Sequence, residues 1–336
     1  MANRSGKKGP TLYDLFHKNP LAGKGVSKND KLPRNFKNFF KLSWWHISTI
    51  ISVNLLFLVG NFPIFFLGLG FSGFFNETAP SPASSIYSVL FGAMQESADP
   101  VSAALYGIHG AQGVLSATTV PTMVMYAIGA LLILTFGLTN IGTTYILRNL
   151  IKGDPVFVWH DFWYAIKRNL RQGIIMGVVD LFLMVLIVYD VAFFYFNMGV
   201  FVGSMMFFAA IFLGAVYFVM RFYIYNLIIT FDLSLPKIIK NAFIFSALGL
   251  KRNLLAFFGI VFLVLLDYYF LIVLMPLGIM LPMIVLYGYC AYIASYAAWP
   301  KIKEIMVDPY EAEHKNENSD ENEESEETPI FTDDVK

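Results

Sequence analysis

The sequence predicts an all-α fold: a polytopic membrane helix bundle with six transmembrane helices, inner-surface amphipathic helices and both termini on the inner side. Composition is the first reason. Of the 336 residues, 57% are hydrophobic and 14% are charged, whereas a soluble domain is about 45–50% apolar and about 25% charged. The second reason is a series of long apolar runs, and the third is the one-sided placement of the basic residues.

Six apolar runs are long enough to cross a bilayer, which takes about 20 mostly apolar residues. The last two are separated only by Pro276, Gly278 and Pro282, a combination typical of a short turn between helices. The predicted spans are residues 46–71, 119–147, 174–196, 201–231, 254–274 and 277–298.

The basic residues predict the orientation, because cytoplasmic loops collect Lys and Arg. The segment 72–118 contains neither residue type and is therefore predicted to lie outside. Both termini are predicted to lie inside. Of the 24 Lys and Arg residues, all except Arg221 fall in the segments 1–45, 148–173, 232–253 and 299–336.

The same charge pattern predicts three parts of the chain. Residues 1–43 form a basic cytoplasmic arm, which can touch anionic lipid headgroups. Residues 44–300 form the six-helix transmembrane domain, in which 72–118 is an extracellular insertion. Residues 301–336 form an acidic cytoplasmic tail that is predicted to be disordered, because its composition cannot bury a core.

Two stretches, residues 155–171 and 236–248, predict amphipathic helices along the inner surface. In the first, Asp154 is the expected N-cap and Pro155 the first helical residue. Lys-Arg-Asn-Leu occurs in both regions, at 167–170 and 251–254. The recurrence of this tetrapeptide suggests that the chain contains three repeated units, each a surface helix followed by a two-helix hairpin. Interfacial anchoring by basic and aromatic residues is the alternative explanation.

Several short motifs occur in a fixed order along the chain. Asn54-Leu55-Leu56 is followed by Phe62-Pro63-Ile64, then by a Gly-rich segment from Gly137 to Asp154, and then by Asp161-Phe162-Trp163 and a basic stretch from Lys167 to Gln172. With these motifs the chain resembles the YesL-like family of uncharacterised bacterial membrane proteins, and "GKGVSKND" is similar to its longer clostridial members.

The resemblance covers roughly residues 20–300 and departs from the family at 72–118, where a short link is expected. It implies a multi-pass protein of the bacterial plasma membrane. Relatives are often associated with carbohydrate uptake systems, so the resemblance implies a role beside such a system. It implies no established activity.

No motif for catalysis is recognisable in the sequence. The five histidines have no metal-ligand spacing, and neither a nucleophile motif nor a phosphate-binding loop is present. The only cysteine, Cys290, lies in an apolar run and is expected to serve packing. The sequence therefore predicts no catalytic, cofactor-binding or metal-binding residues, no cofactor, and no enzyme.

Polar residues inside the predicted spans are the most informative candidates. Asp180 and Arg221 are predicted to form an ion pair, because adjacent spans place them at similar depth in the inner half of the membrane. Asp190, Asp267 and Asn54 are the other candidates. They indicate either a cation or proton path, the default hypothesis for charges inside a membrane, or polar contacts between helices.

The leading prediction is a non-enzymatic accessory or regulatory membrane protein associated with carbohydrate (oligosaccharide) uptake. The alternative is a small-solute or ion transporter, which should show a polar midplane cavity and broken helices rather than a dry, packed bundle. Expected partners are membrane lipid and a membrane transporter or permease subunit, whereas nucleic acid is not expected. The oligomeric state is open. The predicted docking face comprises Trp163, Lys167, Arg168, Lys237 and Lys240.

Overall fold

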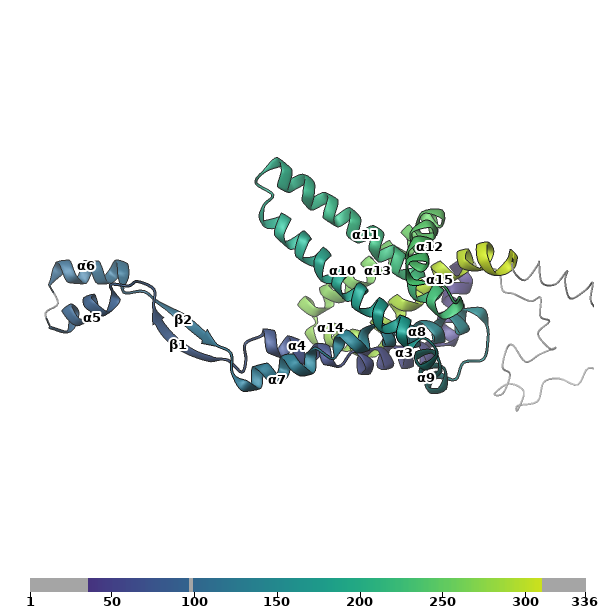
Figure 1. Ribbon diagram of the computed structural model, residues 1–336, viewed down its shortest axis with the longest axis horizontal. Helices are drawn as coiled ribbons and strands as arrows, with labels where there is room; N and C mark the ends of the chain where they lie inside the picture. The colour runs from purple at the N-terminus through teal and green to yellow at the C-terminus, as the bar shows by residue number, and fades with distance from the viewer. Residues whose placement is uncertain (1–35, 97–98, 310–336) are drawn as a thin grey trace, which may run out of the picture. The chain divides into compact units, whose positions relative to one another are not determined.

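A computed structural model describes residues 36–96 and 99–309 of the chain (Figure 1). Helices make up most of the described part, and the only sheet there is a two-stranded ribbon. The predicted all-α membrane bundle is therefore confirmed. The predictions for most of the basic arm, up to residue 35, and for most of the acidic tail, from residue 310, lie outside the described residues.

The chain divides into two compact units between Ile47 and Ser48. The described helix of the first unit is α2 (Phe36–Trp45). Its phenylalanine rings pack edge to face along one side, with Phe36 and Phe40 at 5.2 Å between ring centroids. Lys41 places its ammonium group 4.3 Å from the Trp45 ring. α2 is thus a short amphipathic helix that combines aromatic and basic side chains.

The predicted spans correspond to long helices, with one difference. Residues 46–71 form two shorter helices, α3 (Ile47–Gly60) and α4 (Pro63–Phe71), because Pro63 has no amide hydrogen to continue the helix. Five helical spans are long and apolar enough to cross a membrane, and a sixth results only if α2 and α3 count as one. The first four are α7 (Val120–Gly129) together with α8 (Leu132–Lys152), α10 (Leu170–Phe196), α11 (Phe201–Thr230) and α13 (Leu250–Val273). The fifth consists of four consecutive elements: α14 (Met275–Leu281), the π-helix η1 (Pro282–Leu286), α15 (Tyr287–Ile302) and the π-helix η2 (Lys303–Val307).

Three of these helices, α8, α11 and α15, contact one another pairwise and form the centre of the bundle. Packing and close approach, rather than the hydrophobic effect, drive helix association in lipid. The tightest approach joins α8 to α10, where a Cβ on Gly137 would lie 2.6 Å from the Cα of Gly177. The largest fully buried side chains of the central helices are Ile141, Ile146, Leu147, Tyr223, Ile224, Leu227, Ile228, Tyr292 and Ile302.

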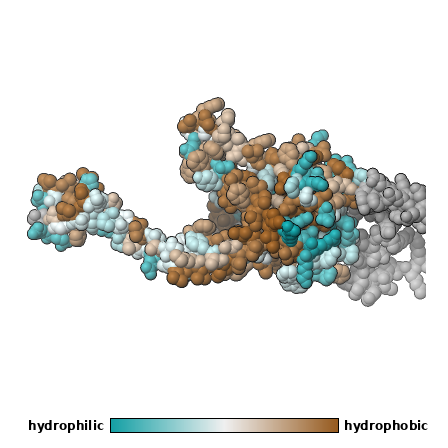
Figure 2. Space-filling model, in the orientation of Figure 1, coloured by the Kyte–Doolittle hydropathy of each residue, from teal (hydrophilic) through white to brown (hydrophobic). Residues whose placement is uncertain are grey.

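Two shorter helices, α9 (Val158–Arg168) and α12 (Leu235–Leu248), correspond to the predicted surface helices. α9 packs on α8 and α12 packs on α11, so each contacts the long helix that precedes it in the chain. Hydrophilic residues gather at the end of the bundle where these helices lie, and hydrophobic residues cover the spans (Figure 2). The order of surface helix and hairpin therefore recurs, as the repeat hypothesis expects.

The start of α9 differs from the prediction, because Asp154 is not its N-cap. Gly153 adopts a positive φ of 83° and ends α8, with the Asp154 N–H donating to the Asn149 carbonyl at 3.0 Å. Asp154 instead pairs with Lys152 at 2.7 Å. The cap of α9 is supplied from within the helix, where Asp161 Oδ2 accepts from the backbone N–H of Phe157 at 3.0 Å.

The predicted insertion is an ordered unit of its own. β1 (Glu77–Pro82) pairs antiparallel with β2 (Gln112–Ala117), from Glu77 opposite Ala117 to Pro82 opposite Gln112. Between the strands lie α5 (Tyr87–Glu96) and α6 (Pro100–His109) (Figure 1). Leu90 is the one buried side chain on these two helices among the described residues. The insertion is therefore held by backbone pairing more than by a core.

Candidate functional site

The predicted ion pair between Asp180 on α10 and Arg221 on α11 is present. Arg221 Nε lies 2.9 Å from Asp180 Oδ1 and 3.1 Å from Oδ2. The carboxylate is fully buried, and the arginine side chain is 19% exposed. Asp180 lies nine residues beyond Arg171, which is about 14 Å along the helix. That distance is close to half of a hydrocarbon core about 30 Å thick.

Two tyrosines complete the surroundings of this carboxylate. Tyr217 donates its hydroxyl hydrogen to Asp180 Oδ1 at 2.8 Å, and Tyr225 donates to Oδ2 at 2.6 Å. Tyr217, Arg221 and Tyr225 follow one another at steps of four residues, so they share one face of α11. Sequence reasoning missed the tyrosines, although the spacing Tyr-x-x-x-Arg-x-x-x-Tyr was visible.

This arrangement satisfies the hydrogen-bonding capacity of a buried carboxylate. Each oxygen accepts a hydrogen bond from one tyrosine, and Oδ2 also accepts one from Arg221 Nε, which forms the ion pair with Oδ1. The guanidinium also lies 5.7 Å from the Phe136 ring on α8. Buried ion pairs are tolerated when such additional bonds offset the loss of hydration. The cluster therefore links α8, α10 and α11 as a polar contact between the three helices.

The other predicted acids are not brought to this cluster. Asp190 lies ten residues further along α10, and Asp267 lies on α13. Neither forms a hydrogen bond or ion pair with any described residue, and Asp267 Oδ1 is buried without a partner. The three acids thus occupy separate places rather than one continuous path.

Asn54 on α3 forms hydrogen bonds with backbone groups in and next to the π-helix η1 of the last span. Its amide nitrogen donates to the carbonyls of Pro282 and Met283, both at 3.0 Å, and its amide oxygen accepts from the Gly288 N–H at 2.9 Å. A π-helix disturbs the regular backbone pairing, and Asn54 supplies partners for the groups that are released. Its role in the bundle is therefore a polar contact between α3 and the last span.

Arg148, near the end of α8, was not among the predicted site residues. It is 9% exposed and donates to the Ile229 carbonyl at 3.0 Å and to Thr230 Oγ1 at 3.1 Å. Its guanidinium also lies 4.7 Å from the Tyr145 ring. Ile229 and Thr230 are the last two residues of α11, and a cation at the carboxyl end of a helix is stabilised by the helix dipole. The signal was a charged side chain directly after the uncharged run 119–147, one helical turn before Lys152.

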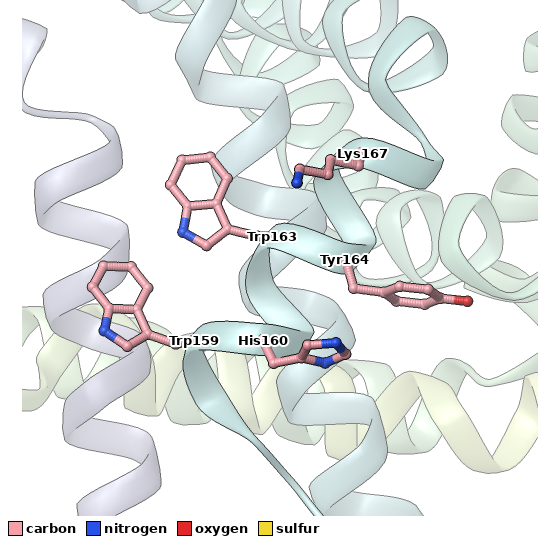
Figure 3. A pocket seen from close by; sticks show the side chains of 5 residues that line it. All are labelled: Trp159, His160, Trp163, Tyr164 and Lys167. Atoms are coloured by element: carbon pink, nitrogen blue, oxygen red, sulfur yellow. The ribbon is translucent and has the colours of Figure 1, made fainter.

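The residues of the predicted docking face are exposed but lie on two separate helices. Trp163, which is 51% exposed, Lys167 and Arg168 belong to α9, and Lys237 and Lys240 belong to α12. Trp163 and Lys167 border a surface hollow on α9. Around it, Trp159 and Trp163 project to one side of the helix and His160 and Tyr164 to the other (Figure 3). The hollow is lined by Trp159, His160, Trp163, Tyr164 and Lys167.

Across the described part of the chain, no three His, Cys, Asp or Glu side chains are placed to hold a metal ion. Comparisons with protein-family models, curated proteins and solved structures found no match. The resemblance to the YesL-like family therefore remains a prediction. The chain is an integral membrane protein by its long apolar helices, and its function has to be argued from the bundle itself.

Proposed function

We propose that this integral membrane protein is an accessory or regulatory component of the bacterial plasma membrane that has no catalysis of its own and works through a membrane partner. The observation that carries the proposal is the closely packed centre of the bundle, where α8, α11 and α15 pack large apolar side chains against one another beside smaller polar ones such as Thr139, Thr143 and Asn226. Asp180, Asn54 and Arg148 are bound by neighbouring helices. Their polar groups therefore hold the bundle together.

The outer halves of α10 and α11 are the surface proposed to receive the partner. Beyond Asp180, no residue of α10 is buried in the bundle. Several large aromatic residues on this hairpin are exposed, including Phe196 and Phe201 at 83% each. Helix association in membranes depends on packing, and this hairpin offers an unoccupied apolar face for a permease helix. The carbohydrate context of the proposal comes from the YesL-like resemblance alone.

Two observations favour a small-solute or ion transporter as the second candidate. The break between α3 and α4 leaves Asn61 Oδ1 buried without a partner, and the last span contains a π-helix. Discontinuous helices with polar groups at mid-depth line the substrate sites of many transporters. The Asp180–Arg221 pair lies at a comparable depth.

Reconstitution of the purified protein separates the two candidates. Liposomes that contain only this protein should accumulate labelled oligosaccharides or cations no faster than protein-free liposomes. Accumulation that Asp180→Asn abolishes would establish a transporter and refute the accessory role.

The partner surface has its own test. A photo-crosslinking amino acid at Phe208, which is 63% exposed on α11, should link to another membrane protein in the native membrane. The same group at Phe71, which is 77% exposed on α4, is the matched control. Equal crosslinking at both positions, or none at Phe208, would contradict the assignment of the surface.

A further inference from the structure

The outward face of α9 combines exposed tryptophans with a lysine. Trp159 is 65% exposed and Trp163 is 51% exposed. Both border the hollow that Lys167 also lines, as the close view shows (Figure 3). The opposite face is fixed on α8, where the Phe162 ring fills the space beside Gly142. Because the Phe162 face of α9 packs on α8, the exposed tryptophans lie on the remaining faces of the helix.

The cations on and after α9 have no carboxylate partner within residues 36–96 and 99–309. Lys167, Arg168 and Arg171 are exposed and form no ion pair there. The one acid of the helix, Asp161, is buried and accepts the hydrogen bond from Phe157 that caps α9. This surface therefore carries an excess of positive charge that an anionic ligand would neutralise.

The neighbouring tryptophans indicate which anion fits. Tryptophan rings are enriched at the level of lipid headgroups, and amphipathic helices with basic and aromatic residues lie in that interface. A free phosphate would neutralise the lysine but leave both indole rings in water. In a phospholipid, the phosphate of the headgroup neutralises the lysine and the attached acyl chains cover the indole rings.

We propose that the hollow on α9 binds the headgroup of an anionic phospholipid of the inner leaflet. The phosphate accepts a hydrogen bond from Lys167 Nζ, and the first part of the acyl chains lies beside Trp159 and Trp163. The proposal rests on the predicted orientation of the bundle and is independent of the accessory role. It assigns one defined site to lipid on a face that the sequence assigned to a docking protein.

The test uses the full-length protein in nanodiscs of phosphatidylcholine with either brominated phosphatidylglycerol or brominated phosphatidylcholine. Trp44, Trp45 and Trp299 are replaced by phenylalanine, so that the fluorescence reports on Trp159 and Trp163 alone. Bromine quenches tryptophan fluorescence at close range, so the glycerol lipid should quench more strongly. Lys167→Gln should reduce this preference about fivefold, the factor expected from about 1 kcal/mol per basic residue near an anionic surface. Lys167→Arg should preserve the preference.

Lys240→Gln is the matched control, because Lys240 is also exposed but belongs to α12 rather than to the hollow. It should keep the preference. Three results would each overturn the proposal: equal quenching by both lipids, which would leave the face to a protein partner; equal losses in both glutamine variants, which would indicate diffuse attraction; and full competition by soluble glycerol phosphate, which would indicate a free-anion site.

The leaflet requires a separate measurement. In a background with Cys290→Ala, Ser84→Cys should react with an impermeant thiol reagent on intact cells, and Ser234→Cys should not. Ser234 immediately precedes α12, and Ser84 lies between β1 and α5. Labelling of Ser234→Cys from outside would place α9 at the outer leaflet and refute the proposal.

Discussion

The α10–α11 hairpin and the insertion between α4 and α7 are both two-armed segments, but different interactions hold them. The hairpin has an inner half whose side chains reach the core, where Asp180 is fully buried. In the insertion, the arms are strands joined by backbone pairing, and Leu90 is the one buried side chain of its two helices among the residues described. The comparison indicates that stability resides in the inner half of the bundle, whereas the insertion is an appended module.

The largest effect should follow from breaking the buried pair. Asp180→Asn and Arg221→Gln should each destabilise the bundle by about 3–5 kcal/mol, the loss typical when one buried charge remains unpaired. Thermal unfolding in detergent measures the effect. The double variant should lose clearly less unfolding free energy than the sum of the two single variants, because the two residues interact directly. Full additivity would show that the pair does not act as a unit.

The pair could be predicted from the sequence because charges in neighbouring apolar runs rarely remain alone. The tyrosines beside it and the contacts of Arg148 could not, since hydrogen bonds between distant helices depend on the rotation of each helix. The same holds for Asn54: its place in an apolar run marked it as a candidate, but its partners lie 228 to 234 residues away in sequence. The spans were predictable from hydropathy. The break before Pro63 depends instead on one residue, because proline has no backbone N–H to donate to the preceding turn of the helix.

A smaller loss should follow from Asn54→Ala, which removes the partner of the Gly288 N–H and of two carbonyls. Leaving a buried polar group unpaired costs about 1–3 kcal/mol, so the midpoint temperature of thermal unfolding in detergent should fall. Asn197→Ala is the control, because its amide bonds the Phe193 carbonyl at an exposed position. Equal losses in both variants would show that the contact at η1 has no special weight.

Removing the insertion should leave the bundle nearly unchanged. Residues 77 and 117 are paired across the ribbon, so a short Gly-Ser linker can replace the segment between them. The contact between α4 and α7, where the Tyr126 hydroxyl donates to the Gly70 carbonyl at 3.1 Å, remains in place. We expect a change in unfolding free energy within about 0.5 kcal/mol, as for surface changes away from a core. A loss as large as that of Asn54→Ala would show that the module is part of the fold.

The smallest expected effect is local and depends on pH. Asp99 caps α6, and the hydrogen bond from Ser102 to its carboxylate lowers the pKa of Asp99 below its usual value. A carboxyl group with a lowered pKa in the folded state stabilises that state above its unfolded pKa, and the contribution is lost as the pH falls through the folded pKa. Protection of the α6 amides against hydrogen exchange should therefore decrease in acid, relative to neutral pH, after correction for intrinsic rates. Asp99→Asn separates the cap from the charge, because asparagine is also a preferred N-cap but does not titrate. This variant should keep the protection of α6 and lose its dependence on pH, and an unchanged pH dependence would assign the effect to another group.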